Sequence, residues 1–170
     1  MEPNGTLKYR EDIVDRIAES GIWVNPTLYQ VTGAGQEILL KKSEEFGLTP
    51  EEEVRLEGLK RLYPQHINHV GKMAEAGVKL VTGSDCGWGD MPFDRIYREM
   101  ELFVDSGMTN MEAIITATSK AAQSLGLQDV IGTLEPGKEA DVAVFGGAPH
   151  SNVSDISRIL AVFQGGEQVL

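Results

Sequence analysis

The sequence is poor in cysteine, in basic residues and in long apolar runs. A single cysteine among 170 residues excludes an internal disulfide framework, so we expect a reducing, cytoplasmic compartment. Acidic residues outnumber Lys and Arg by 26 to 15, and the net charge of −11 argues against nucleic acid or an anionic membrane as a partner. No apolar run approaches the roughly 20 residues that a membrane-spanning helix needs. We therefore expect a protein with neither a membrane nor a nucleic-acid partner.

The remaining composition is that of an ordinary globular protein. Apolar residues make up 41% of the chain and charged residues 24%, which argues against wholesale disorder. A chain of this length can also bury a sizeable core. The N-terminal residues Met1–Gly5 lack the basic and then apolar pattern of a signal peptide.

A helix, a glycine and a short apolar strand follow one another twice along the chain. Residues 9–20 carry a helical apolar pattern that stops at a glycine, and Ile22–Val24 follows as a strand. Residues 64–76 form a second such pattern, again closed by a glycine, and Val78–Val81 is the next strand. Successive units of this kind are typical of an α/β protein with a parallel sheet.

The segment between these two strands contains one helix start and two expected interruptions. Gly33 and Gly35 should break any helix that begins directly after the first strand, which leaves residues 37–45 as a helix of their own. Thr49, followed by proline and two glutamates, predicts a capping box that begins the next helix. Pro64 should break that helix, because proline lacks the amide that an interior turn requires.

After the second strand the pattern changes from βα units to a small all-β segment. Residues 93–105 should form a helix, and a second capping box at Thr109 should begin another that runs to about Ser124. Glu135–Lys138 reads as a type II turn, with proline and glycine in its central positions. A strand at 140–145 and a hairpin over 159–170 complete the pattern, so we expect the βα units to end near residue 128.

The segment Thr82–Gly87 is the most informative in the chain because it directly follows the second apolar strand. A carboxylate among small residues at the exit of a buried strand is how α/β barrels present a catalytic group. The alternative is an ordinary turn, since Ser, Asp and Gly are common turn residues. Asp85 is therefore the leading candidate for a catalytic residue.

Three successive segments resemble the metal-dependent amidohydrolase superfamily. Gly132–Val142 resembles the motif with which that family's chain leaves its (β/α)8 barrel, and Ala117–Ala122 resembles the helix after the eighth barrel strand. Thr82–Asp85 resembles the end of the eighth strand itself. Gly21–Leu28 is similar to the seventh strand of the imidazolonepropionase-like and prolidase-like branch.

The resemblance implies the C-terminal portion of an α/β TIM barrel over residues 1–128 and part of a small β-sandwich over 129–170. It also implies that Asp85 is a metal ligand and proton carrier beside one or two divalent metal ions, zinc by expectation. The family's His-x-His pair, carboxylated lysine and further histidines cannot be assigned here, so the chain is expected to begin just after the sixth strand. Either a missing N-terminal part of the barrel or a second copy of the chain in a homo-oligomer would then complete the barrel.

Two functions from different classes follow from this resemblance. The first is a hydrolase of the amide or other C–N bond of a small molecule, such as a dipeptide, an N-acyl amino acid or a cyclic amide. The second is a catalytically inert fragment that only folds or associates, since two strands with open edges form a poor independent sheet.

Several other side chains are weaker candidates for the site. Asn25, Thr27 and Tyr29 after the first strand, and Trp88 after the second, would line the substrate pocket unless they are plain loop residues. Cys86 is expected to pack under the strand end rather than to react. The histidines, His66, His69 and His150, are expected to face the surface, since none occupies a ligand position of the family.

Overall fold

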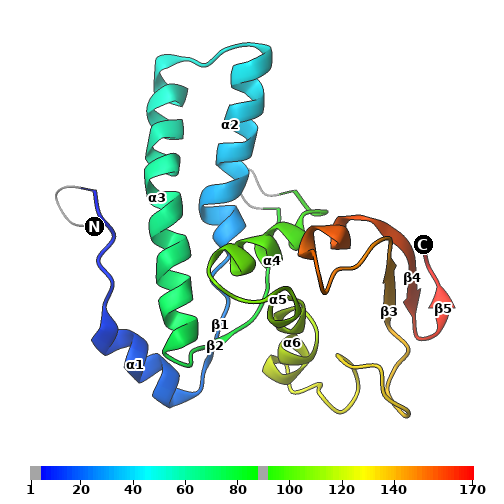
Figure 1. The fold of residues 1–170 in the computed structure, drawn as a ribbon. Helices are drawn as coiled ribbons and strands as arrows, with labels where there is room; N and C mark the ends of the chain where they lie inside the picture. Colours follow the sequence, from blue (N-terminus) through cyan, green and yellow to red (C-terminus); the bar gives the residue numbers. More distant parts are fainter. Residues whose placement is uncertain (1–4, 88–91) are drawn as a thin grey trace.

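Residues 5–87 and 92–170 are described by the computed structural model, and they form an α/β structure (Figure 1). Helix α1 (Glu11–Ser20) ends at Gly21, whose φ of 67° is left-handed and therefore favours a residue without a Cβ. Strand β1 (Trp23–Val24) follows at once. The predicted order of helix, glycine and strand is confirmed for this first unit.

Strand β1 pairs in parallel with β2 (Lys79–Leu80), as the repeated pattern predicts. Trp23 lies opposite Lys79 and Val24 opposite Leu80, and Leu80 is almost completely buried. The backbone amide of Val81 also donates to the carbonyl of Val24 at 3.0 Å. Because parallel strands run in the same direction, the segments that leave β1 and β2 emerge at the same edge.

A long helical hairpin connects the two strands and projects from the rest of the molecule (Figure 1). It consists of the π-helical turn η1 (Tyr29–Gly33), α2 (Ala34–Glu45) and α3 (Pro50–Glu75). The prediction that Gly33 and Gly35 interrupt a helix is wrong, because both lie inside this helical run. A Cβ at Gly33 would lie 2.5 Å from Cδ2 of Tyr29, so glycine leaves room for that ring to pack over the turn.

The expected break at Pro64 is also wrong, since α3 continues through it. Pro64 is exposed, and the helix is held on either side of it by the buried residues Leu56 and Val70. The capping box at Thr49 is confirmed: its hydroxyl accepts from the Glu52 amide at 3.3 Å and its amide donates to the Glu52 carboxylate at 2.9 Å. Capping and tertiary packing together outweigh one lost backbone bond.

Three shorter helices follow β2: α4 (Ile96–Asp105), α5 (Asn110–Thr116) and α6 (Ser119–Ser124). The second capping box is confirmed, with the Glu112 amide 3.2 Å from the Thr109 hydroxyl. The helix that was expected to run to about Ser124 is divided at residues 117–118. The division coincides with a contact from a segment distant in the sequence, because the carbonyl of Thr116 accepts from the Thr82 amide at 3.2 Å.

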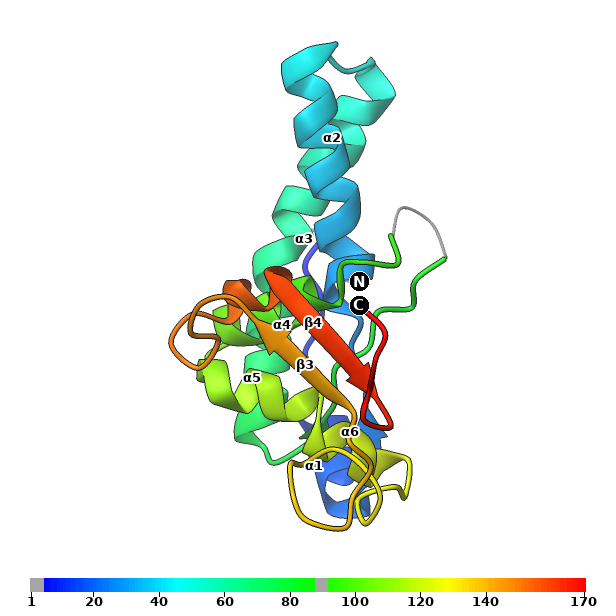
Figure 2. The ribbon, with the colours of Figure 1, turned by 90° about the vertical axis from the view of Figure 1, so that its right-hand side faces the viewer.

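The C-terminal segment forms an antiparallel sheet on one side of α4 and α5 (Figure 2). Its strands are β3 (Val142–Phe145), β4 (Ile159–Gln164) and β5 (Glu167–Gln168), in that order across the sheet. The predicted turn at Glu135–Lys138 is confirmed by a 3.2 Å bond between its terminal residues. The 3₁₀ helix η2 (Val153–Ser157) joins β3 to β4.

The main core lies where α3, α4, α5, η2 and strand β2 meet. Phe103 on α4 and Ala113 on α5 are completely buried, and η2 contributes Val153 and Ile156 to the same cluster. The β-rich C-terminal segment therefore shares apolar contacts with the helices. Among the described helices, none is both long enough and apolar enough to cross a membrane.

Candidate active site at the carboxyl ends of β1 and β2

The segments that leave β1 and β2 lie side by side. Thr82 is held against α5, because its hydroxyl is 2.6 Å from the hydroxyl of the buried Thr116. Gly83 then passes so close to Asn25 that a Cβ at Gly83 would overlap the side-chain amide of Asn25. The structure therefore brings together two segments that the sequence analysis selected separately. Asp85 follows two residues after Gly83, in the same segment.

Both segments contain a strained residue. In residues 5–87 and 92–170, Thr27 (φ 46°) and Asp85 (φ 49°) are the non-glycine residues with positive φ. Left-handed backbone costs a non-glycine residue about 1–2 kcal/mol, and it is rare for a β-branched residue such as Thr27. Strain of this kind persists only where surrounding contacts hold it, and it clusters at functional sites.

Asp85 and its neighbour Cys86 are both exposed. The expectation that Cys86 packs under the strand end is wrong, because it lies in the turn beyond the strand. Asn25 is exposed as well, and its side-chain oxygen accepts from the Thr27 amide at 3.3 Å. Trp88 lies outside the described residues, so its place in the pocket stays a prediction.

The turn after β1 is anchored by a residue that the sequence analysis missed. Glu99 on α4 is completely buried, and its two carboxylate oxygens accept from the amides of Leu28 and Tyr29, each at 2.8 Å. Burial raises the pKa of Glu99 to about 7, although the two backbone bonds act in the opposite direction. A signal was present in the sequence, since Glu99 interrupts the apolar stripe that includes Met100 and Phe103.

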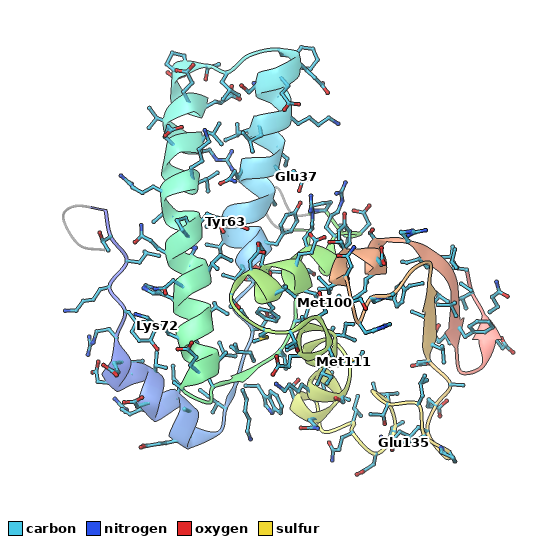
Figure 3. All side chains as sticks on the ribbon, viewed as in Figure 1. Glu37, Tyr63, Lys72, Met100, Met111 and Glu135 are labelled. Carbon is cyan, nitrogen blue, oxygen red and sulfur yellow. The ribbon has the colours of Figure 1, made fainter. Side chains whose placement is uncertain are left out.

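Tyr29 lines a cavity of about 280 Å³ between α2, α3 and α4. Its hydroxyl donates to Glu37 at 2.8 Å, and burial together with this bond raises the pKa of Tyr29 to about 12. Arg98 donates to the same carboxylate at 3.0 Å. Figure 3 shows Glu37 and Tyr63 on the two helices of the hairpin, above Met100 of α4. A contact between Tyr29 and substrate stays a prediction.

The described residues do not form a complete metal site. Within residues 5–87 and 92–170, no group of three or more His, Cys, Asp or Glu side chains is placed to hold a metal ion. Asp85 is therefore a single candidate donor. His150 is exposed as expected, whereas His66 and His69 are only half-exposed and burial lowers the pKa of each. The ring of His69 lies 5.2 Å from that of Tyr9.

Comparisons with known proteins agree with this arrangement. A model of the Amidohydrolase family matches residues 5–169, so the chain belongs to the amidohydrolase family. It is 33% identical over 103 residues to an imidazolonepropionase of Geobacillus thermodenitrificans and 29% identical over 133 residues to one of Fusobacterium nucleatum. A crystal structure of a Xaa-Pro dipeptidase with bound methionine in the active site superposes with a TM-score of 0.71 and 27% identity. The chain thus lies in the imidazolonepropionase-like and prolidase-like branch.

The aligned regions are a minor part of these relatives. They cover 58% and 78% of this chain but only 24% and 30% of the two imidazolonepropionases. The structural match covers 94% of this chain and 37% of the dipeptidase. The chain therefore spans well under half the length of each of these three proteins.

Proposed function

We propose that this chain forms the last βα units and part of the β-sandwich of a metal-dependent amidohydrolase. Residues 1–128 would belong to the (β/α)8 barrel and residues 129–170 to the sandwich. The observation that supports this proposal best is the edge where β1 and β2 end, since Asn25 and Asp85 emerge there from neighbouring parallel strands. Active sites of α/β barrels are built at this edge.

Asp85 is the proposed acid–base residue. Its exposed carboxylate can take a proton from an attacking water and return it to the nitrogen of the leaving group. A divalent metal, with Asp85 among its ligands, would supply Lewis acidity. Because the described residues lack a complete ligand set, the remaining donors must come from a partner chain or from further barrel units. Only the acid–base role is therefore assigned to this chain.

The proposed substrate is a small molecule with a hydrolysable C–N bond. The relatives named above are imidazolonepropionases and a Xaa-Pro dipeptidase, which supports a cyclic amide or a dipeptide, and an N-acyl amino acid belongs to the same chemical class. Asn25, Thr27, Tyr29 and Trp88 are proposed to contact it.

The proposal is tested by replacing Asp85 with asparagine in the protein that contains this chain. Zinc content is measured by mass spectrometry, and hydrolysis is followed with a Xaa-Pro dipeptide, an N-acyl amino acid and an imidazolone. Asp85→Asn should lower kcat by at least about 100-fold, because it removes the acid–base group. The matched control is Asp12→Asn, an exposed aspartate of α1 that pairs with Arg10 at 2.6 Å and should leave activity unchanged. Equal activity in the two variants would overturn the role of Asp85, and absence of both zinc and hydrolysis would overturn the proposed function.

A further inference from the structure

Glu99 connects the two segments that carry the candidate site. It lies on α4, the first helix after the segment that contains Asp85, while its two partners are the first residues after the strained turn at Thr27. Both carboxylate oxygens accept from backbone amides, at 2.8 Å each, and the side chain has no exposed surface. The contact thus joins α4 to the start of η1 through a pair of charge-assisted bonds.

We propose that Glu99 is a positioning residue of the candidate site, whose carboxylate clamps the amides of Leu28 and Tyr29 and so holds the Asn25–Thr27 turn beside the Asp85 segment. The role in hydrolysis rests on the proposed function, whereas the clamp itself can be tested without any activity.

The backbone around Thr27 explains why such a clamp is needed. The amides at the start of a helix have no partner within the helix, so a buried carboxylate that accepts two of them satisfies both and also suits the positive end of the helix dipole. A residue with φ of 46° keeps that conformation only if the backbone is held on both sides. Pairing of β1 with β2 holds the preceding side, and Glu99 holds the following side.

Complete burial distinguishes the Glu99 carboxylate from the other acidic side chains of the described residues. Burial raises the pKa of Glu99 to about 7, and within the described residues no charged neighbour contributes to the rise. The titratable groups on the surrounding elements include Tyr29 on η1, Glu37 on α2, Tyr63 on α3, Glu112 on α5 and Asp155 on η2, besides Arg95, Arg98, Glu101 and Asp105 on or next to α4. The protonation state of Glu99 near neutral pH can be followed through the amides of Leu28 and Tyr29, because both donate to its carboxylate.

The experiment follows the amide resonances of Leu28 and Tyr29 by NMR between about pH 5 and about pH 9, a range that brackets the Glu99 transition. In the wild-type chain both resonances should shift together with one midpoint near pH 7. Glu99→Gln, which is nearly isosteric, should abolish this transition, because glutamine does not titrate and has a single acceptor oxygen. The matched control is Glu101→Gln on the same helix, which removes a carboxylate bound to Arg98 at 2.8 Å and should retain the transition. Leu28 and Tyr29 amides that exchange with solvent as fast as unstructured amides in the wild-type chain would overturn the clamp, and this outcome requires no variant to fold.

Hydrogen exchange separates positioning from a merely structural role. In Glu99→Gln, exchange of the Leu28 and Tyr29 amides should rise at least about tenfold, the equivalent of about 1.4 kcal/mol, while the amide of the completely buried Ala113, which donates to the Thr109 carbonyl at 3.0 Å, stays protected. An equal rise at Ala113 would mean general loosening of the core and would overturn the positioning role.

The pH profile of hydrolysis distinguishes this inference from the proposed function. If the protein hydrolyses a C–N bond, Glu99→Gln should lower kcat and remove the part of the pH–rate profile with a midpoint near 7. Hydrolysis with an unchanged profile in Glu99→Gln would overturn the positioning role and leave the proposed function standing. Conversely, an inactive protein whose Leu28 and Tyr29 amides titrate together would overturn the proposed function and leave the clamp standing.

Discussion

Two glycines of α3 provide a paired test of how the helical hairpin packs on the rest of the molecule. A Cβ at Gly71 would overlap the backbone carbonyl oxygen of Ser106, where α3 crosses the end of α4. Gly58 lies on the same helix, and apart from its chain neighbours and the adjacent backbone of α3 no described atom lies within 4 Å of a Cβ added there. Substitution of each by alanine therefore separates helix propensity from steric overlap.

The expected magnitudes follow from these two environments. Alanine is favoured over glycine in a helix interior by about 1 kcal/mol, so Gly58→Ala should stabilise the chain by about 0.5–1 kcal/mol. Gly71→Ala gains the same propensity but forces the carbonyl of Ser106 away. That carbonyl cannot move freely, because the amide and hydroxyl of Ser106 are bound to α4 at 2.9 and 2.7 Å. Overpacking of this kind costs about 1–3 kcal/mol, which should separate the two variants by that amount.

The free energy of unfolding is measured by urea denaturation of the wild-type chain and both variants. Gly58→Ala should have the highest midpoint and Gly71→Ala a clearly lower one, with equal denaturant slopes if the unfolded state is unchanged. If Gly71→Ala were as stable as Gly58→Ala, the close contact between α3 and Ser106 would be refuted.

Three further predictions concern the clamp, a cap and the strand edge. The folded-state pKa of Glu99, about 7, lies above its ordinary value of 4.5, so its stabilising contribution is complete below about pH 4.5 and lost as pH rises through about 7. Urea denaturation should then show wild-type stability falling by about 3 kcal/mol relative to Glu99→Gln, and parallel pH curves would contradict this. Thr109→Ala should cost about 1 kcal/mol in thermal unfolding because it removes a helix cap, and an unchanged melting temperature would contradict that. Gly83→Ala should shift the side-chain amide resonances of Asn25, while unshifted resonances would argue against their contact.

Much of the fold could be predicted from signals within a few residues of one another. Local backbone chemistry determines the helix end at glycine, the two capping boxes and the turn at Glu135–Lys138. The structure confirms each of these predictions. The parallel pairing of β1 with β2 follows from the repetition of one such local pattern.

The errors arose where a distant contact outweighs a local preference. Pro64 and Gly33 are unfavourable within a helix, yet packing of Leu56 and Val70 and the ring of Tyr29 hold the helical run together. After Thr116 a distant contact instead divides a continuous helical pattern, because the Thr116 carbonyl accepts a hydrogen bond from the Thr82 amide. Local propensity contains no information on either kind of partner.

The candidate site contains residues of both kinds: one that a local pattern identifies and one whose partners are distant in the sequence. Asp85 could be selected from the sequence because a strand, small residues and a carboxylate stand next to one another within one segment. Glu99 could be recognised only as an acid in an apolar stripe, which must find donors because an unpartnered buried carboxylate is costly. Its partners, Leu28 and Tyr29, lie 71 and 70 positions away, so their identity depends on the parallel pairing of β1 with β2 and on the packing of α4. The position of Asn25 beside Gly83, two residues before Asp85, is therefore a property of the assembled fold, and removal of the Glu99 carboxylate should alter that position before it unfolds the core.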